Sequence, residues 1–117
     1  MAQDPKPTEK RQVERLSLEV YANRGEMGVA AGRAAAAAMR ATLARQARCR
    51  VVLAAAPSQN EFLAELRQSP GIDWTRVTAF PMDEYVGLGP DAPQSFVHYL
   101  KASILDAVKP GQVHFLN

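Results

Sequence analysis

The sequence predicts an α/β protein of three layers, with a mostly parallel sheet and helices on both of its faces. Apolar runs at residues 50–56 and 76–82 have the length and composition of buried strands. Segments with helical character alternate with these runs, as they do where crossover helices join parallel strands. At 117 residues the chain is long enough for one domain with its own hydrophobic core.

Residues 1–13 are expected to form a disordered leader, followed by one domain over residues 14–117. The leader is rich in charge and contains Pro5 and Pro7, a composition that does not support a packed core. It lacks the apolar stretch of a secretory signal, so we expect a cytoplasmic protein. Apolar and polar residues then alternate over 16–21, which predicts a short strand.

A long helix is expected from Asn23 to about residue 47. Asn is a common N-cap residue, and the run 34–38 consists of alanine, the strongest helix former. Gly28 and Gly32 weaken the first turns, and we interpret them as places where another backbone lies close. The later elements are a central strand at 50–56 covered on both faces, a helix at 61–68, a strand at 76–82, a helix at 94–108 and a strand at 112–117.

The composition argues against several kinds of partner. The formal net charge is +2 and the basic residues are scattered, so no stripe for nucleic acid is formed. No uninterrupted apolar stretch reaches membrane-spanning length. Cys49 is the sole cysteine and excludes an internal disulfide. His98 and His114 lack the spacing of metal ligands, and we expect neither a metal nor a cofactor.

Two adjacent carboxylates, Asp83 and Glu84, follow the strand predicted at 76–82. The carboxyl edge of a parallel sheet is where open α/β folds bind their ligands. A carboxylate held there against apolar neighbours becomes more basic and can move a proton to and from carbon. The alternative is a polar corner in which both side chains are simply solvated.

The turn at residues 54–60 is the second candidate site. A helix that starts directly after a core strand presents free backbone N–H groups and a positive dipole end, which suit a phosphate. Ser58 offers a hydroxyl as a further contact. The alternative is that Ser58 or Asn60 only caps the helix.

The segment Met-Asp-Glu-Tyr-Val-Gly-Leu at 82–88, followed by Pro-Gln-Ser-Phe at 93–96, resembles the signature of the glucosamine-6-phosphate deaminase/isomerase family. The similarity extends from about residue 16 to the C-terminus. It implies a Rossmann-like fold and an incomplete domain, because this chain looks like the N-terminal part of a family member. The related 6-phosphogluconolactonases usually have Asp-Glu-Arg at 83–85, so Tyr85 favours the deaminase branch.

The resemblance implies an activity that converts an amino-sugar phosphate into a keto-sugar phosphate and ammonia. Asp83 matches the general base that carries a proton between C2 and C1 of the open-chain sugar, and no metal is needed. The partner would be a small-molecule sugar phosphate, and a homo-oligomer is implied without any visible interface. The expected substrate-binding residues are Ala56, Ser58, Gln59, Glu84, Tyr85 and Gly87.

The chain also departs from the family. The usual glycine-rich turn is replaced by Ala55-Ala56-Pro57-Ser58, and Pro57 has no N–H to offer a phosphate. The later family segment with its histidine and basic residues is absent from these 117 residues, so we expect them to turn over substrate poorly on their own. A non-catalytic sugar-phosphate binding module and a 6-phosphogluconolactonase-like hydrolase are the alternative functions.

Overall fold

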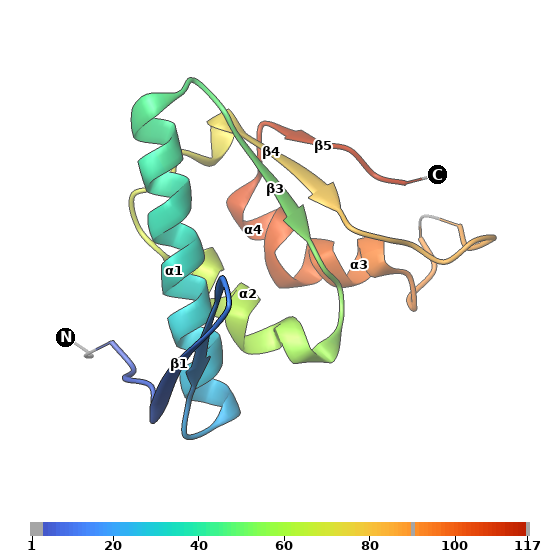
Figure 1. The fold of residues 1–117 in the computed structure, drawn as a ribbon. Helices are drawn as coiled ribbons and strands as arrows, with labels where there is room; N and C mark the ends of the chain where they lie inside the picture. The colour runs from blue at the N-terminus through green and yellow to red at the C-terminus, as the bar shows by residue number, and fades with distance from the viewer. Residues whose placement is uncertain (1–3, 90, 117) are drawn as a thin grey trace.

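The computed structural model describes residues 4–89 and 91–116. Figure 1 shows a long helix beside a small sheet, with the other helices behind it. The strands are β1 (Glu9–Val13), β2 (Leu16–Val20), β3 (Cys49–Leu53), β4 (Val77–Pro81) and β5 (Gln112–Val113). The α-helices are α1 (Arg24–Arg45), α2 (Asn60–Gln68), α3 (Phe96–Leu100) and α4 (Asp106–Val108), with a π-helical stretch, Lys101–Leu105, between α3 and α4.

The main sheet is parallel and has the order β3-β4-β5, which confirms the expected α/β class. The prediction that the first of these strands is central is wrong, because β4 lies in the middle and β3 at the edge. The burial of the β3 side chains agrees with this edge position. The two end residues of the strand, Cys49 and Leu53, are buried, whereas Arg50 and Val52 are exposed. An apolar run indicates a strand but not its position in the sheet.

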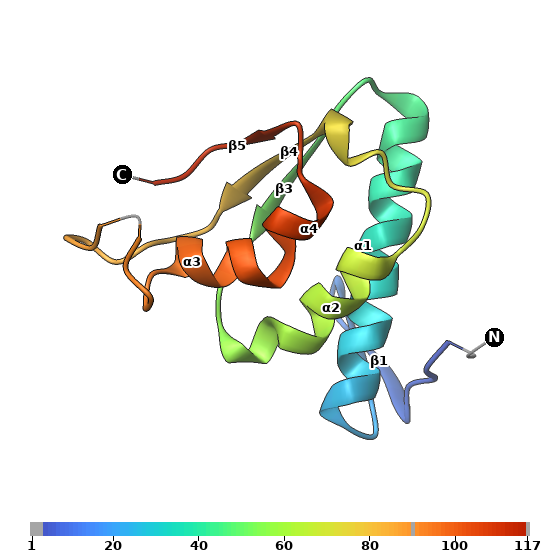
Figure 2. The ribbon, with the colours of Figure 1, turned by 180° about the vertical axis from the view of Figure 1, so that it is seen from behind.

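The hydrophobic core lies between the sheet and the helices. α3 and α4 lie on one face of the sheet, with α2 beside them, and α1 runs along the β3 edge (Figures 1 and 2). On the opposite face of the sheet Val52, in the edge strand β3, is 62% exposed, whereas Thr78 and Ala79 of β4, neighbours that face opposite sides, are both buried. The core side chains include Met39, Leu43, Leu53, Leu63, Leu66, Val77, Ala79, Leu100, Ile104 and Leu105.

α1 and α2 pack closely because two glycines of α1 face α2. A Cβ on Gly28 would lie 2.3 Å from the Cβ of Glu61, and one on Gly32 would lie 2.6 Å from the Cβ of Glu65. The expectation that another backbone lies near both glycines is therefore confirmed. The expected helix start is confirmed as well, because Asn23 Oδ1 accepts a hydrogen bond from the N–H of Glu26 at 2.8 Å.

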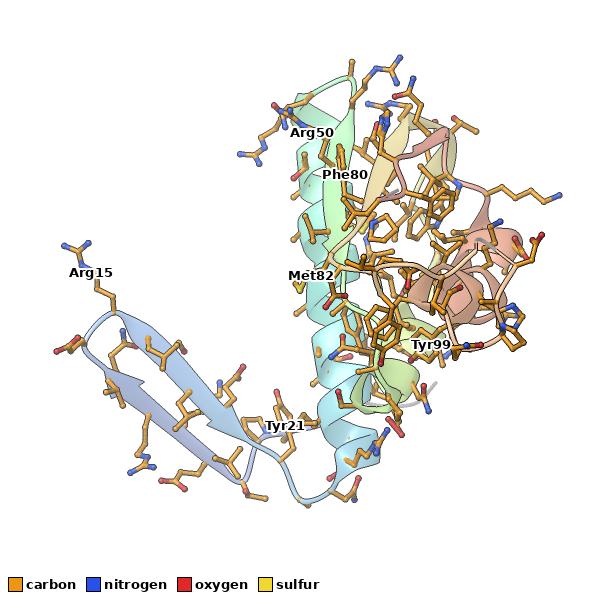
Figure 3. The ribbon with its side chains drawn as sticks, turned by 90° about the vertical axis from the view of Figure 1, so that its right-hand side faces the viewer. Arg15, Tyr21, Arg50, Phe80, Met82 and Tyr99 are labelled. Atoms are coloured by element: carbon orange, nitrogen blue, oxygen red, sulfur yellow. The ribbon has the colours of Figure 1, made fainter. Side chains whose placement is uncertain are left out.

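An N-terminal hairpin replaces most of the expected disordered leader. β1 pairs antiparallel with β2 in a register that joins Glu9 to Val20 and Val13 to Leu16. The prediction of disorder is thus wrong for Glu9–Val13, where cross-strand pairing supplies the order that composition did not indicate. Residues 1–3 of that segment lie outside the described residues. The hairpin projects away from the rest of the molecule, with Arg15 at its tip (Figure 3).

The C-terminal elements are shorter than expected. The helix predicted at 94–108 begins at Phe96, because Ser95 is its N-cap and accepts the N–H of His98 at 3.0 Å. The strand predicted at 112–117 is limited to Gln112–Val113, and residue 117 lies outside the described residues. Over the described part of the chain, none of the helices combines the length and apolarity that crossing a membrane requires.

Candidate functional site

The two segments singled out from the sequence leave the sheet at the same edge. β3 and β4 are parallel neighbours, and Leu53 at the end of β3 is in register with Pro81 at the end of β4. The N–H of Met82 donates to the carbonyl of Leu53 at 2.8 Å and extends this pairing by one bond. The turn after β3 and the acidic loop after β4 therefore start side by side at the carboxyl edge, where ligands of parallel sheets bind.

Asp83 is exposed at the start of the acidic loop. The sequence analysis expected a carboxylate held against apolar neighbours, and the described residues do not bury it. Met82 and Tyr85, which flank this acidic pair, are themselves 57% and 53% exposed. In this structure the side chain of Asp83 is accessible to a ligand.

Glu84 is bound to the backbone of the protein. Its Oε1 accepts the N–H groups of Tyr85 and Phe96, both at 2.9 Å, and its Oε2 accepts the N–H of Val97 at 3.0 Å. The hydrogen bond from Phe96 is the main reason why the pKa of Glu84 lies below its ordinary value, and the N–H groups of Val97 and Tyr85 add to it. Glu84 thus connects the acidic loop to the first N–H groups of α3.

Tyr85 and Gly87 shape the same loop. The Tyr85 ring packs on that of Phe96, with 4.6 Å between the ring centroids. Gly87 has a φ of +88°, a conformation that favours glycine, and nothing lies within 4 Å of a Cβ placed there. The turn itself, rather than a close neighbour, therefore accounts for glycine at this position.

The turn after β3 begins as a 3₁₀ turn, Pro57–Gln59, that continues into α2. Ala56 is its N-cap, and no side-chain hydrogen bond caps either this turn or α2. The capping role considered for Ser58 and Asn60 is therefore not observed. Ser58 is exposed, while Ala56 and Gln59 are half-buried.

Tyr99 is a residue of this region that the sequence analysis did not single out. Its hydroxyl oxygen lies 2.7 Å from the carbonyl oxygen of Ala56 and 2.6 Å from Oδ1 of Asn60. Burial raises the pKa of its phenol. The contact spans 43 positions along the chain. A tyrosine within a helix gives no local sign of such a partner, so sequence patterns could not have found it.

The two histidines take no part in these contacts. His98 is exposed on α3. His114 follows β5 and stacks on Phe80 with 5.2 Å between the ring centroids, and its N–H donates to the carbonyl of Ala79 at 3.0 Å. This stack lies on β4, next to the carboxyl edge, and gives His114 a packing role.

Comparison with known proteins places this geometry in context. No family model matches the chain. The chain is similar to the glucosamine-6-phosphate deaminase of Arthrobacter sp. (strain FB24), with 44% identity over 54 residues that make up 44% of this chain and 21% of that protein. The other curated proteins that it matches are also glucosamine-6-phosphate deaminases, and the matches span 20–26% of the length of these relatives.

Solved structures share the fold. A 6-phosphogluconolactonase from Shewanella baltica OS155 matches with a TM-score of 0.74 and 14% identity. A monomeric glucosamine-6-phosphate deaminase of the NagB superfamily matches with a TM-score of 0.70 and 21% identity. Each match covers 81% of this chain and 40% of the other chain. The resemblance to this group of proteins is confirmed, and the Rossmann-like fold is common to both of its branches.

Proposed function

We propose that this chain carries one part of the active site of a glucosamine-6-phosphate deaminase/isomerase-like enzyme, with Asp83 as the general base. The observation that carries the proposal is the pairing of β3 with β4, which brings the acidic loop and the turn with Ser58 to one edge of the sheet. The similarity to curated deaminases supports the same substrate class.

In the proposed reaction Asp83 removes the proton from C2 of the open-chain amino sugar and returns it to C1. C1 gains the proton that C2 loses, and O1 gains a proton to replace the one that the amine gives up. The aldehyde thus becomes an alcohol and the C2 amine an imine, which water hydrolyses to a ketone and ammonia. One carboxylate that reaches both carbons is sufficient for the proton transfer. The exposure of Asp83 leaves its oxygens free for this contact, whereas Glu84 is occupied by three backbone N–H groups.

The turn at Ala56–Gln59 is proposed to receive the phosphate. α2 follows this turn directly, so its positive dipole end points toward the sheet edge. The absence of a side-chain cap at the start of the turn leaves the position open to an anion. Ser58 is exposed there and adds a hydroxyl donor. Tyr85 and Gly87, in the opposite loop, are proposed to contact the sugar.

Binding of a sugar phosphate without turnover is the second candidate. Two observations favour it: Asp83 is exposed and is not held against the apolar neighbours expected of the base, and Pro57 stands in the phosphate turn without an N–H. A protein of this kind would bind the sugar phosphate and leave it unchanged. Lactone hydrolysis is favoured only by the fold shared with a 6-phosphogluconolactonase.

The test is ammonia release from glucosamine-6-phosphate by the protein expressed from the complete reading frame. We expect Asp83→Asn to abolish ammonia release and to leave substrate binding close to that of the wild type. Asp91→Asn is the matched control, because Asp91 is an exposed carboxylate of the same loop. Equal activity of the two variants would contradict the role of Asp83 as the base.

The same samples separate the three functions. Binding of glucosamine-6-phosphate without ammonia release by the wild type would favour the binding module. Hydrolysis of 6-phosphogluconolactone without ammonia release would favour the lactonase. Both outcomes would refute the deaminase reaction, and calorimetric titration with each compound measures binding independently of turnover.

A further inference from the structure

The turn at Ala56–Asn60 is ordered by contacts from other parts of the chain. The carbonyl of Ala56 accepts the N–H of Gln59 at 2.9 Å and also faces the Tyr99 hydroxyl at 2.7 Å. The carbonyl of Pro57 accepts a hydrogen bond from the guanidinium of Arg24, which also pairs with Glu61. Both carbonyls at the start of the turn are therefore held by side chains from distant segments.

Proline limits the remaining freedom of this turn. The ring of Pro57 sets φ near −65°, so the orientation of the Ala56 carbonyl decides how the next peptide groups point. The Tyr99 hydroxyl has one proton and donates it to one acceptor at a time. The Asn60 amide can turn its NH₂ group toward the Tyr99 oxygen, in which case both contacts of the hydroxyl are satisfied together.

Tyr99 belongs to the helix that Glu84 holds. The first N–H groups of α3, those of Phe96 and Val97, donate to the Glu84 carboxylate. Tyr99 lies one turn further along this helix, and its own N–H donates to the carbonyl of Ser95 at 3.2 Å. A continuous series of hydrogen bonds thus runs from the residue next to Asp83, through α3, to the turn that carries Ser58.

We propose that Tyr99 is a positioning residue, which sets the phosphate turn and couples it to the loop of Asp83. The inference rests on the proposed function, because it assigns Tyr99 a role in binding the phosphate of the same substrate. Tyr99 itself does not contact the reacting carbons. Its hydroxyl keeps the turn in a binding-competent form before the ligand arrives, and a preorganised site loses less entropy on binding.

The experiment compares Tyr99→Phe with wild type in the protein expressed from the complete reading frame. Phenylalanine keeps the ring and removes only the hydroxyl. Tyr21→Phe is the matched control, because it makes the same change at the end of the hairpin, far along the chain from the turn. Glucosamine-6-phosphate and inorganic phosphate are titrated separately, and backbone amide signals of Gln59, Phe96 and Val97 are followed by NMR.

We expect Tyr99→Phe to weaken binding of both compounds about three- to tenfold, the usual loss for one hydrogen bond. We also expect faster hydrogen exchange at the Gln59 amide without ligand, and smaller ligand-induced shifts at Phe96 and Val97. A purely structural role would lower the melting temperature but leave affinity and the coupled shifts unchanged. Asn60→Ala, which keeps the contact with Ala56, should give a smaller loss.

The outcomes separate this inference from the proposed function. If the wild type binds and Tyr99→Phe binds equally well, the role of Tyr99 is overturned while the proposed function stands. If the wild type binds neither compound, the proposed phosphate site is refuted, and the role of Tyr99 in it fails too. Unchanged exchange at Gln59 in ligand-free Tyr99→Phe would contradict the inference without bearing on the reaction.

Discussion

The close crossing of α1 and α2 makes Gly28→Ala the most direct test of the fold. The new Cβ would lie 2.3 Å from the Cβ of Glu61 and 3.1 Å from the backbone atoms Glu61 C and Phe62 N. Carbon atoms in contact prefer a separation of about 3.5–4.0 Å, so the helices must separate by about 1.2 Å or more. No rotamer change relieves this contact, because a Cβ and a backbone are fixed to their helix.

Two opposing effects set the magnitude. Alanine in the interior of a helix is favoured over glycine by about 1 kcal/mol. Overpacking of a well-packed interface costs about 1–3 kcal/mol, and here it also moves Leu63 and Leu66, each 1% exposed, away from their contacts. A Cβ–Cβ separation of 2.3 Å is a severe overlap, so we take the upper half of this cost, about 2–3 kcal/mol. The expected net loss in the free energy of unfolding is then about 1–2 kcal/mol, which corresponds to about 4–8 °C in melting temperature.

The assay is urea and thermal unfolding followed by circular dichroism. Gly25→Ala is the matched control, since the nearest atom to its Cβ would be Asn23 Oδ1 at an ordinary 3.4 Å. This control should stay within about 0.5 kcal/mol of the wild type. Gly32→Ala, with its Cβ 2.6 Å from that of Glu65, should behave as Gly28→Ala does. If Gly28→Ala were as stable as the control, the close packing of these helices would be refuted.

Three further predictions concern other contacts. The guanidinium of Arg76 donates to three carbonyls near the end of α1, at 2.7–2.8 Å. Arg76→Ala should therefore lower the free energy of unfolding, measured in urea, by about 2 kcal/mol. Arg45 is exposed, and Arg45→Ala should lower it by less than about 0.5 kcal/mol. The hydrogen bond from Arg33 lowers the pKa of Glu65, and the N–H of Phe96 lowers that of Glu84, both from the ordinary value of 4.5. The unfolded chain therefore binds more protons than the folded protein in acid, so the urea midpoint should fall as the pH drops below about 4.5 and stay level above it. A rise of the midpoint in acid would contradict this sign. Burial raises the pKa of the Cys49 thiol, so iodoacetamide should label the native protein about tenfold or more slowly than the unfolded chain, and equal rates would show that the thiol is accessible.

Local chemistry in the sequence was sufficient for most of the elements. Asn23 marks the start of α1 because its side chain bonds to a backbone N–H three residues away, which a short window of sequence contains. Pro81 ends β4, as a residue without an N–H is expected to do in a strand. The acidic pair at the end of this strand was found in the same way, because the strand and the loop follow each other directly.

Burial and partners could not be predicted from the same information. Asp83 was expected to lie against apolar neighbours, but exposure depends on which other segments cover the loop. β1 was missed because its strand conformation comes from pairing with β2. Its five residues, Glu-Lys-Arg-Gln-Val, are mostly charged or polar and have no strand pattern of their own. The position of each strand in the sheet was likewise beyond local patterns, since β3 was expected to be central and lies at the edge.

The sequence by itself determined the class of fold, the order of its elements from β2 onward and the carboxylate-bearing loop, because each depends on interactions between residues close together in the chain. The tertiary structure alone decided that β4 is central, that Glu84 holds the start of α3, and that Tyr99 meets the turn after β3. These contacts join residues 12 to 43 positions apart. These partners are brought together by the packing of the whole chain, and a local sequence pattern cannot predict which residues will meet.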